Sequence, residues 1–317
     1  AICSLHSDGP NDGEWLASRV HELGLSNILR LTTLRISRGD PLPGVSDFDA
    51  VIIGGTFHGV HDNRPWQQLL QPWLHAHRTT GKPLLGICGG HQAMAVALGG
   101  KVTKRSSGMQ VGSVPVQLTQ AGTSHPLFAG ICSPPPRFHF GNSDEVTTVP
   151  KDSTILASTS DSPAVAIDYG GGWRSVQYHP EATASIFQHW VDTAVLKPPT
   201  ESNAFRHLVT GRQFIGNFLS DGLHQLNMHQ IEQLPHFVHK LTTLLQSHDS
   251  SSSTMTKALS TLLSSVSNPE QLFTASQTDF DEHQWNLFYG LVEVHQHSDL
   301  MNFSAPLLNT LCRLIPP

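Results

Sequence analysis

The chain has 317 residues, of which 38% are hydrophobic and 14% are charged, a balance typical of a folded protein rather than a disordered or membrane-spanning one. The formal net charge is −6 and no run of Lys or Arg occurs, so we expect neither a nucleic-acid partner nor attachment to a membrane. The length predicts one large domain accompanied by a smaller one.

The sequence also bears on compartment and cofactors. The first residues contain neither a basic segment nor a long apolar one, so we expect no secretory signal. The 4 Cys are too few and too scattered for a disulfide framework, which predicts a cytoplasmic location. The 20 His are spread along the chain, and we expect no metal ion and no other cofactor.

Residues 1–196 alternate short apolar runs with amphipathic segments, a pattern typical of an α/β domain. In chain order, the apolar periodicity predicts a strand at 2–5, a helix at 12–23, strands at 28–36 and 51–53, a helix at 66–76, a strand at 84–87, a helix at 93–98, strands at 111–118, 137–140, 164–167 and 173–178, and a helix at 184–196.

The stretch from Leu84 to Met94 predicts a buried strand, a sharp turn at Cys88 and the start of a helix. Gly86 and Gly90 lie two residues to either side of Cys88, where such a turn leaves no room for a Cβ. This is the arrangement of a nucleophile elbow, with a thiol as the nucleophile. The helix start favours the thiolate and directs free backbone N–H groups toward the attacked atom.

A cysteine nucleophile needs a base and a group that orients the base. His179 and Glu181 follow the strand predicted at 173–178, and Pro180 stiffens the chain between them. Side chains two residues apart in an extended segment point to the same side, so both can face one target. We therefore expect His179 as the base and Glu181 as its acidic partner.

A Gly-Gly-Thr turn at residues 54–56 follows a buried strand, where α/β sheets place ligand loops. A backbone N–H of this turn could join that of Gly89 in an oxyanion hole. Residues 200–317 differ from what precedes them, because apolar residues recur there only at helical spacing. We expect a separate helical region there, which serves packing or oligomerisation.

The motifs Gly-Ile-Cys-Gly-Gly-His-Gln at 86–92 and Tyr-His-Pro-Glu-Ala-Thr at 178–183 resemble those of the class I glutamine amidotransferases of the Cys-His-Glu type. The resemblance covers residues 1–196 and is greatest to free-standing members related to the GMP synthase glutaminase. These include γ-glutamyl-peptide hydrolases, which share a segment like the Gly-Thr-Phe-His of residues 55–58. It implies a flavodoxin-like, mostly parallel sheet with helices on both faces.

The resemblance also implies roles for individual residues. Cys88 would attack the γ-carbonyl of a γ-glutamyl amide to form a thioester, with His179 and Glu181 completing the triad. The N–H groups of Gly55 and Gly89 would hold the oxyanion. The residues expected to bind the substrate are Gln92, Gln110, Val111 and Asp144. The chain departs from many relatives at Asn142, where they have His, and at residues 54–56, where they have Ser-Gly-Gly or Ser-Gly-Ser.

Three functions remain open from the sequence. The chain could be a free-standing γ-glutamyl hydrolase, in which residues 200–317 shape the pocket or a homodimer. It could instead be a glutaminase that supplies ammonia to a separate synthetase docked through residues 200–317, because it has no nucleotide-binding signature of its own. A non-catalytic regulatory module is the third alternative, and the intact triad disfavours it.

Overall fold

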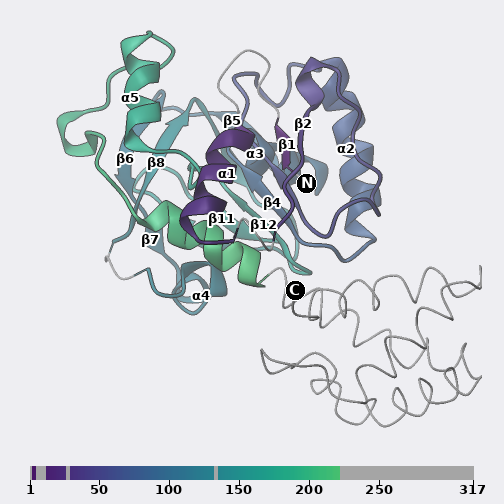
Figure 1. The fold of residues 1–317 in the computed structure, drawn as a ribbon. Coiled ribbons are helices and arrows are strands. Elements are labelled where there is room, and N and C mark those ends of the chain that lie inside the picture. Colours follow the sequence, from purple (N-terminus) through teal and green to yellow (C-terminus); the bar gives the residue numbers. More distant parts are fainter. Residues whose placement is uncertain (1, 5–11, 26–28, 132–134, 222–317) are drawn as a thin grey trace, which may run out of the picture. The chain divides into compact units, whose positions relative to one another are not determined.

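The computed structural model describes residues 2–4, 12–25, 29–131 and 135–221, which belong to one compact unit, Ala1–Gln225 (Figure 1). Its helices are α1 (Asp12–Glu22), α2 (Pro65–Arg78), α3 (Gly89–Ala97), α4 (Gln120–Thr123) and α5 (Ala184–Asp192), followed by a helix over residues 210–221. Its strands are β1 (Ile2–Ser4), β2 (Thr33–Arg35), β3 (Val51–Ile53), β4 (Leu84–Ile87), β5 (Lys101–Lys104), β6 (Gln110–Pro115), β7 (Gln117–Leu118), β8 (Arg137–Asn142), β9 (Asp144–Thr148), β10 (Thr154–Ser158), β11 (Ala166–Asp168) and β12 (Trp173–Val176).

The central sheet has the strand order β2-β1-β3-β4-β12-β11-β10-β7. The strands from β2 to β12 are parallel to their neighbours, and β11, β10 and β7 complete the sheet antiparallel. Two further pairs, β5-β9 and β6-β8, stand apart from this sheet. The sequence thus predicted the fold class correctly: a mostly parallel sheet with helices on both faces.

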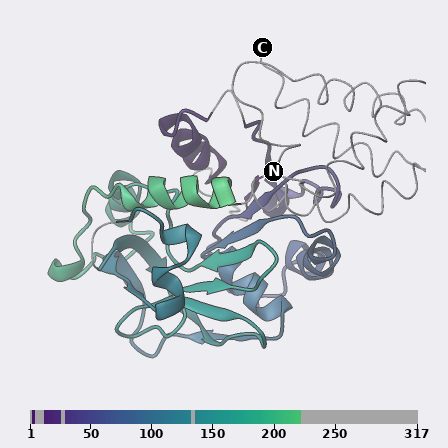
Figure 2. The same ribbon diagram turned by 90° about the horizontal axis from the view of Figure 1, so that it is seen from below.

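Alternating side chains of the central strands divide the core into two layers, because successive residues of a strand point to opposite faces. Ile52 of β3 and Leu85 of β4 pack with α1 and the helix of residues 210–221. Val51, Ile53 and Leu84 pack with α2 and α3 on the other face. Figure 2 shows α1 and the helix of residues 210–221 together on one face of the sheet.

The helix of residues 210–221 buries Phe214, Ile215 and Phe218 completely in the core of this unit. The sequence predicts a separate helical region from residue 200 on, but the described part of that region packs on the α/β core. The helices expected beyond residue 221, and the role proposed for that region, lie outside the described residues.

Local hydrogen bonding explains where the strands and helices differ from the predicted ranges. The strand expected at 28–36 is limited to β2, because the Asp40 carboxylate accepts the N–H of Arg35 at 2.7 Å and a 3₁₀ turn follows. The segment expected as one strand at 111–118 is divided after Pro115 into β6 and β7. The helix expected at 184–196 ends at Asp192, since Ala194 has a φ of +59°.

Candidate active site

Cys88 occupies the turn between β4 and α3 and is a buried free thiol. Its backbone is left-handed, with φ 51° and ψ −101°, a conformation that costs a non-glycine residue about 1–3 kcal/mol. Two backbone hydrogen bonds stabilise it: its N–H donates to the carbonyl of Val176 at 2.8 Å, and its carbonyl accepts the N–H of Gln92 at 3.1 Å. The structure therefore has the strained elbow that the sequence predicts.

The glycines around Cys88 are required by close backbone contacts. A Cβ on Gly86 would lie 2.7 Å from the backbone of Gly90, and a Cβ on Gly90 would lie 2.3 Å from the carbonyl oxygen of Ile53. Neither distance is compatible with a side chain. The two glycines thus let α3 start directly against β3 and β4.

His179 and Glu181 follow β12 and lie beside the elbow. The N–H of His179 donates to the carbonyl of His139 at 2.9 Å, which fixes the chain as it leaves the sheet. His179 Nδ1 lies 2.7 Å from Glu181 Oε1, and the imidazole also forms a hydrogen bond with Cys88. The two side chains are 3% and 2% exposed. The structure thus brings Cys88, His179 and Glu181 together in one hydrogen-bonded row.

This row favours a charged imidazole. Burial alone would lower the pKa of His179, but the negative charges of Glu181 and Cys88 more than offset burial and raise that pKa well above its usual value. The rings of Phe187 and Trp190 stand edge-on to the imidazole, with centroids 5.4 and 6.3 Å away. An imidazolium paired with a thiolate supplies a nucleophile and a proton donor in the same place.

The two predicted oxyanion donors differ in this structure. Gly89 is the first residue of α3, so its N–H has no acceptor within the helix. The N–H of Gly55 instead donates to Asp12 Oδ2 at 3.2 Å. Gly89 and residue Thr56 are in close contact, because a Cβ on Gly89 would lie 2.5 Å from Thr56 Cγ2. The Gly55 turn and the elbow are therefore neighbours, and one of the two donors, the Gly55 N–H, is bonded to the buried Asp12 carboxylate.

Gln92 and Asp144 belong to one polar cluster. Gln92 Nε2 donates to the carbonyl of Asp144 and to Gln177 Oε1, both at 3.1 Å, and Asn142 Nδ2 donates to the same carbonyl at 3.0 Å. Asp144 Oδ1, Asn142 Oδ1 and Gln177 Nε2 are buried and have no hydrogen-bond partner among the described residues. The cluster thus contains two buried acceptors and one buried donor that have no partner among the described residues.

Gln110 and Val111 lie in two different surroundings. The amide of Gln110 donates to Asp161 Oδ1 at 3.1 Å, and the other oxygen of Asp161 pairs with Arg105. Its side chain therefore joins this ion-pair network and not the cluster around Gln92. Val111 is buried beside Phe187 and Trp190, the rings that flank His179.

A pocket opens between α2 and α3, next to the turn of residues 54–56. Gly89 and Gln92 form its wall on the α3 side, and Trp66 and Leu70 belong to its wall on α2. Most of its other lining side chains are apolar or uncharged. The pocket thus lies next to the Gly89 donor and to the polar cluster.

Helix α1 contributes residues that the sequence motifs do not indicate. Asp12 and Arg19 are charged but only 2% and 7% exposed, and they contact Gly55 and the backbone around Glu181 respectively. The spacing of Asp12, Trp15 and Arg19 places them on one face of the helix. That face includes charged residues among apolar ones, a signal that could have marked it as a contact surface.

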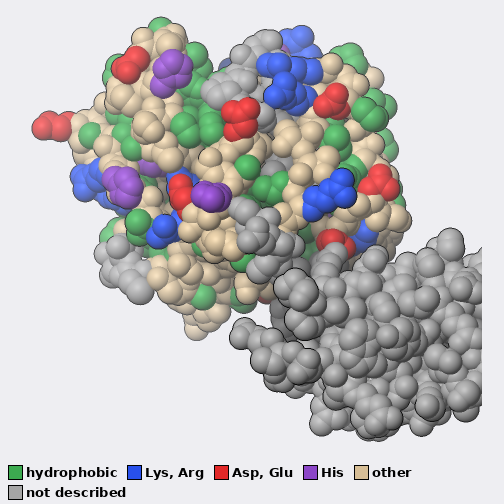
Figure 3. All heavy atoms as spheres, in the orientation of Figure 1, with side chains coloured by type: hydrophobic (Ala, Val, Ile, Leu, Met, Phe, Trp, Pro, Cys, Tyr) green, Lys and Arg blue, Asp and Glu red, His purple; other side chains and the backbone are tan. Residues whose placement is uncertain are grey.

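Within residues 12–221, as far as the structure describes them, no three His, Cys, Asp or Glu side chains are grouped to hold a metal ion. No helix in the described part of the chain is long and apolar enough to cross a membrane. On the face shown in Figure 3, Lys and Arg side chains lie among Asp, Glu and His side chains and form no continuous basic patch.

Known proteins resemble this chain over the same region. A family model described as glutamine amidotransferase class-I matches residues 13–197. A glutamine-hydrolysing GMP synthase of Aeropyrum pernix is 31% identical over 210 residues, which cover 65% of this chain and 33% of that protein. The glutamine amidotransferase-like protein YfeJ of Salmonella typhimurium is 30% identical over 164 residues, which cover 49% of this chain and 66% of that protein. The chain thus spans a third of the first relative and just under two thirds of the second.

Solved structures show the same fold. The protein SMU.1228c has a TM-score of 0.57 and 18% identity, with 70% of this chain and 98% of that chain covered. A glutamine amidotransferase of Thermotoga maritima also has a TM-score of 0.57 and is 17% identical, with 70% of this chain and 96% of that chain covered.

Proposed function

The chain belongs to the class-I glutamine amidotransferase family, and on that premise we propose that it hydrolyses a γ-glutamyl amide through a cysteine thioester. The observation that carries this proposal is the buried row of Cys88, His179 and Glu181, with His179 Nδ1 2.7 Å from Glu181 Oε1. The row supplies a nucleophile, a proton donor and a fixed counter-charge. The same row argues against a purely regulatory module.

In the first half of the reaction, the Cys88 thiolate attacks the γ-carbonyl carbon and a C–S bond forms. The N–H of Gly89 stabilises the oxyanion, and the N–H of Gly55 joins it when the substrate oxygen replaces the Asp12 carboxylate as its acceptor. The imidazolium of His179 then gives its proton to the departing nitrogen. The C–N bond breaks, ammonia or an amine leaves, and the glutamyl thioester remains.

In the second half, neutral His179 takes a proton from water, and the resulting hydroxide attacks the thioester carbonyl. The C–S bond breaks, glutamate leaves, and the thiolate–imidazolium pair is restored. Glu181 keeps the imidazole in one orientation and stabilises its charged form through both halves.

The cluster around Gln92 supports a glutamyl substrate. Its open acceptors on Asp144 and Asn142 suit the α-ammonium group, and its open donor on Gln177 suits the α-carboxylate. Val111 would contribute an apolar wall. The hydrogen bond of Gln110 to Asp161 favours a role in holding the segment before β6, with no direct contact to the substrate.

This proposal has two versions, which differ in the amine that leaves and in whether a partner protein is needed. A free-standing cytoplasmic hydrolase would act on γ-glutamyl conjugates alone or as a homodimer. A glutaminase subunit would deliver ammonia to a separate synthetase, and the similarity to a glutamine-hydrolysing GMP synthase supports this second candidate. In the first version residues 200–317 would shape the substrate pocket or a homodimer, and in the second they would dock the synthetase.

The test is glutamate release by the purified full chain, offered glutamine and, separately, a panel of γ-glutamyl peptides, with Cys88→Ala as the control. Release from peptides by the chain alone, lost in the variant, would support the free-standing hydrolase. Release from glutamine only when an ATP-dependent synthetase is added would support the subunit. Release from none of the substrates, with or without a synthetase, would overturn the proposed function.

A further inference from the structure

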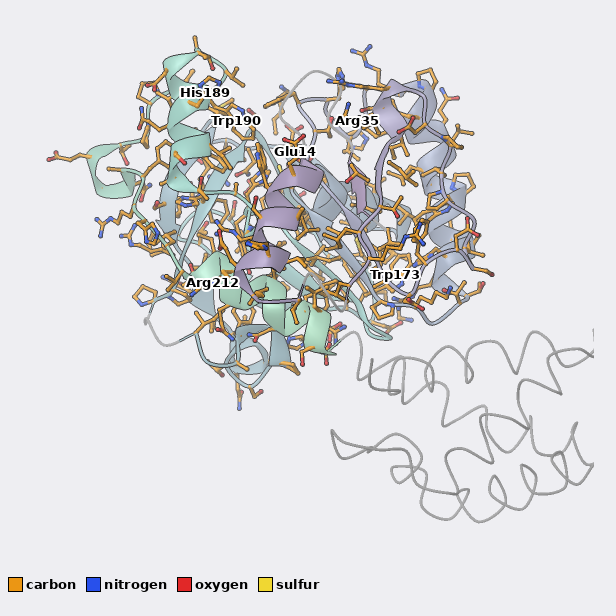
Figure 4. The ribbon with its side chains drawn as sticks, viewed as in Figure 1. Glu14, Arg35, Trp173, His189, Trp190 and Arg212 are labelled. Atoms are coloured by element: carbon orange, nitrogen blue, oxygen red, sulfur yellow. The ribbon has the colours of Figure 1, made fainter. Side chains whose placement is uncertain are left out.

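Arg19 of α1 lies against the segment that carries His179 and Glu181. Its Nε donates to the carbonyl of Glu181 and its Nη2 to the carbonyl of Ala182, both at 3.2 Å. Its Nη1 donates to Glu22 Oε2 at 2.7 Å, one helical turn later. Figure 4 shows the first turn of α1, marked by Glu14, beside Trp190 of α5, and the ring centroids of Trp15 and Trp190 are 5.4 Å apart. Helix α1 is thus packed firmly beside the site.

The two carbonyls that Arg19 holds lie outside the sheet and the helices. Residues 177–183 connect β12 to α5 and belong to neither. Among the described residues, the carbonyls of Glu181 and Ala182 accept no backbone N–H, and Arg19 supplies the donor to each of them. The forked guanidinium supplies donors to two consecutive carbonyls at once, which a lysine ammonium cannot do with the same geometry.

The position of the Glu181 carboxylate depends on this backbone. Only Oε1 has a hydrogen-bond partner, the imidazole of His179, while Oε2 is buried without one among the described residues. Within the described part of the chain, no second side chain therefore forms a hydrogen bond with the carboxylate. A shift of the Glu181 backbone would be transmitted directly to the contact with His179.

We propose that Arg19 is a positioning residue of this active site: by holding the carbonyls of Glu181 and Ala182, it keeps the Glu181 carboxylate on His179. The inference rests on the proposed function. Glu22 is not part of this role, because its side chain is 38% exposed and only neutralises Arg19.

The test compares Arg19→Met and Arg19→Lys with Arg212→Met, a matched change of an exposed arginine on the helix of residues 210–221. Three quantities are measured in the full chain: kcat, KM, and the pH dependence of Cys88 alkylation by iodoacetamide. For Arg19→Met we expect kcat to fall about 10²-fold, the effect of a misplacement near 1 Å, with KM within about twofold. The alkylation midpoint should move to higher pH, because a displaced carboxylate stabilises the imidazolium–thiolate pair less.

Arg19→Lys keeps the charge and the alkyl stem but loses the paired guanidinium donors. It therefore tests whether these two donors are needed, even where Arg19→Met fails to fold. We expect an intermediate loss of kcat, an intermediate alkylation midpoint and native circular dichroism, with Arg212→Met unchanged in all three. Combined with Glu181→Gln, Arg19→Met should lower kcat no further than Glu181→Gln alone. Unchanged kcat and midpoint in both Arg19 variants, or additive losses in the double variant, would overturn the proposal. Absent turnover by the unmodified protein with every substrate, with or without a synthetase, would instead refute the proposed function. The alkylation profile does not require turnover and would still test the role of Arg19.

Discussion

Replacing Glu181 with Gln tests the catalytic row directly. The change preserves the shape of the side chain and removes its charge, 2.7 Å from a buried imidazole. Two unit charges about 4 Å apart at an effective dielectric constant near 20 interact by about 4 kcal/mol. Since 1.36 kcal/mol corresponds to a factor of ten, we expect glutamate release to fall about 10³-fold.

The assay measures both turnover and the ionisation of the row. Loss of the carboxylate lowers the pKa of His179, because burial then acts with less opposition. At neutral pH, fewer imidazoles are charged, so alkylation of Cys88 should slow and should need higher pH. KM should change little, since Glu181 does not belong to the polar cluster around Gln92.

The matched control is Glu201→Gln, which makes the same chemical change at an exposed glutamate. It should leave turnover and alkylation unchanged. If Glu181→Gln kept more than a tenth of the activity of the unmodified protein while folded, the carboxylate would not stabilise the imidazolium in the reaction. The assignment of Glu181 to the row would then be wrong.

Three further changes probe the surroundings of the row. Gly90→Ala should abolish glutamate release and lower the free energy of unfolding in urea by about 1–3 kcal/mol, because the new Cβ would lie 2.3 Å from the carbonyl oxygen of Ile53. The control Gly216→Ala, whose Cβ would meet only a flexible side chain, should remain active. Burial lowers the pKa of His91 to about 3. Below pH 6.5 the unfolded chain therefore binds a proton at His91 that the folded chain does not accept. The contribution of His91 to the free energy of unfolding then falls by about 1.4 kcal/mol for each pH unit of acidification. In urea titrations between pH 7 and 5, His91→Asn should therefore show a shallower loss of stability than the unmodified protein, and equal slopes would contradict this. Asp12→Asn should raise kcat about tenfold in initial-rate assays, because it removes the negative charge that opposes the oxyanion, although the new amide oxygen still competes for the Gly55 N–H. A lower kcat with an unchanged fold would contradict this prediction.

The sequence predicts those parts of the site that depend on local geometry. Gly86, Cys88 and Gly90 lie on one turn, so their spacing alone indicates the strained elbow. His179 and Glu181 are two residues apart on an extended segment, so their shared direction also follows from the sequence. The central strands are predictable because buried parallel strands are nearly continuous apolar runs.

Contacts between distant segments could not be predicted in this way. Arg19 and Glu181 are separated by 162 positions, and nothing in the helical pattern of residues 12–23 indicates that a buried guanidinium meets two carbonyls there. The sequence likewise does not indicate that the amide of Gln110, a residue predicted to bind the substrate, donates to Asp161 in a loop with no periodic pattern. Such choices depend on which donors and acceptors the tertiary fold brings within 3 Å.

Under the proposed function, the two parts of the site differ in how far they are formed. Cys88 is already strained into its position and His179 is already paired, so we expect the first attack to need no rearrangement of these residues. The Gly55 N–H, in contrast, donates to the Asp12 carboxylate and would be released when its acceptor changes to the substrate oxygen. Because Asp12 and Arg19 lie on the same face of α1, a small shift of that helix would affect the oxyanion donor and the Glu181 backbone together.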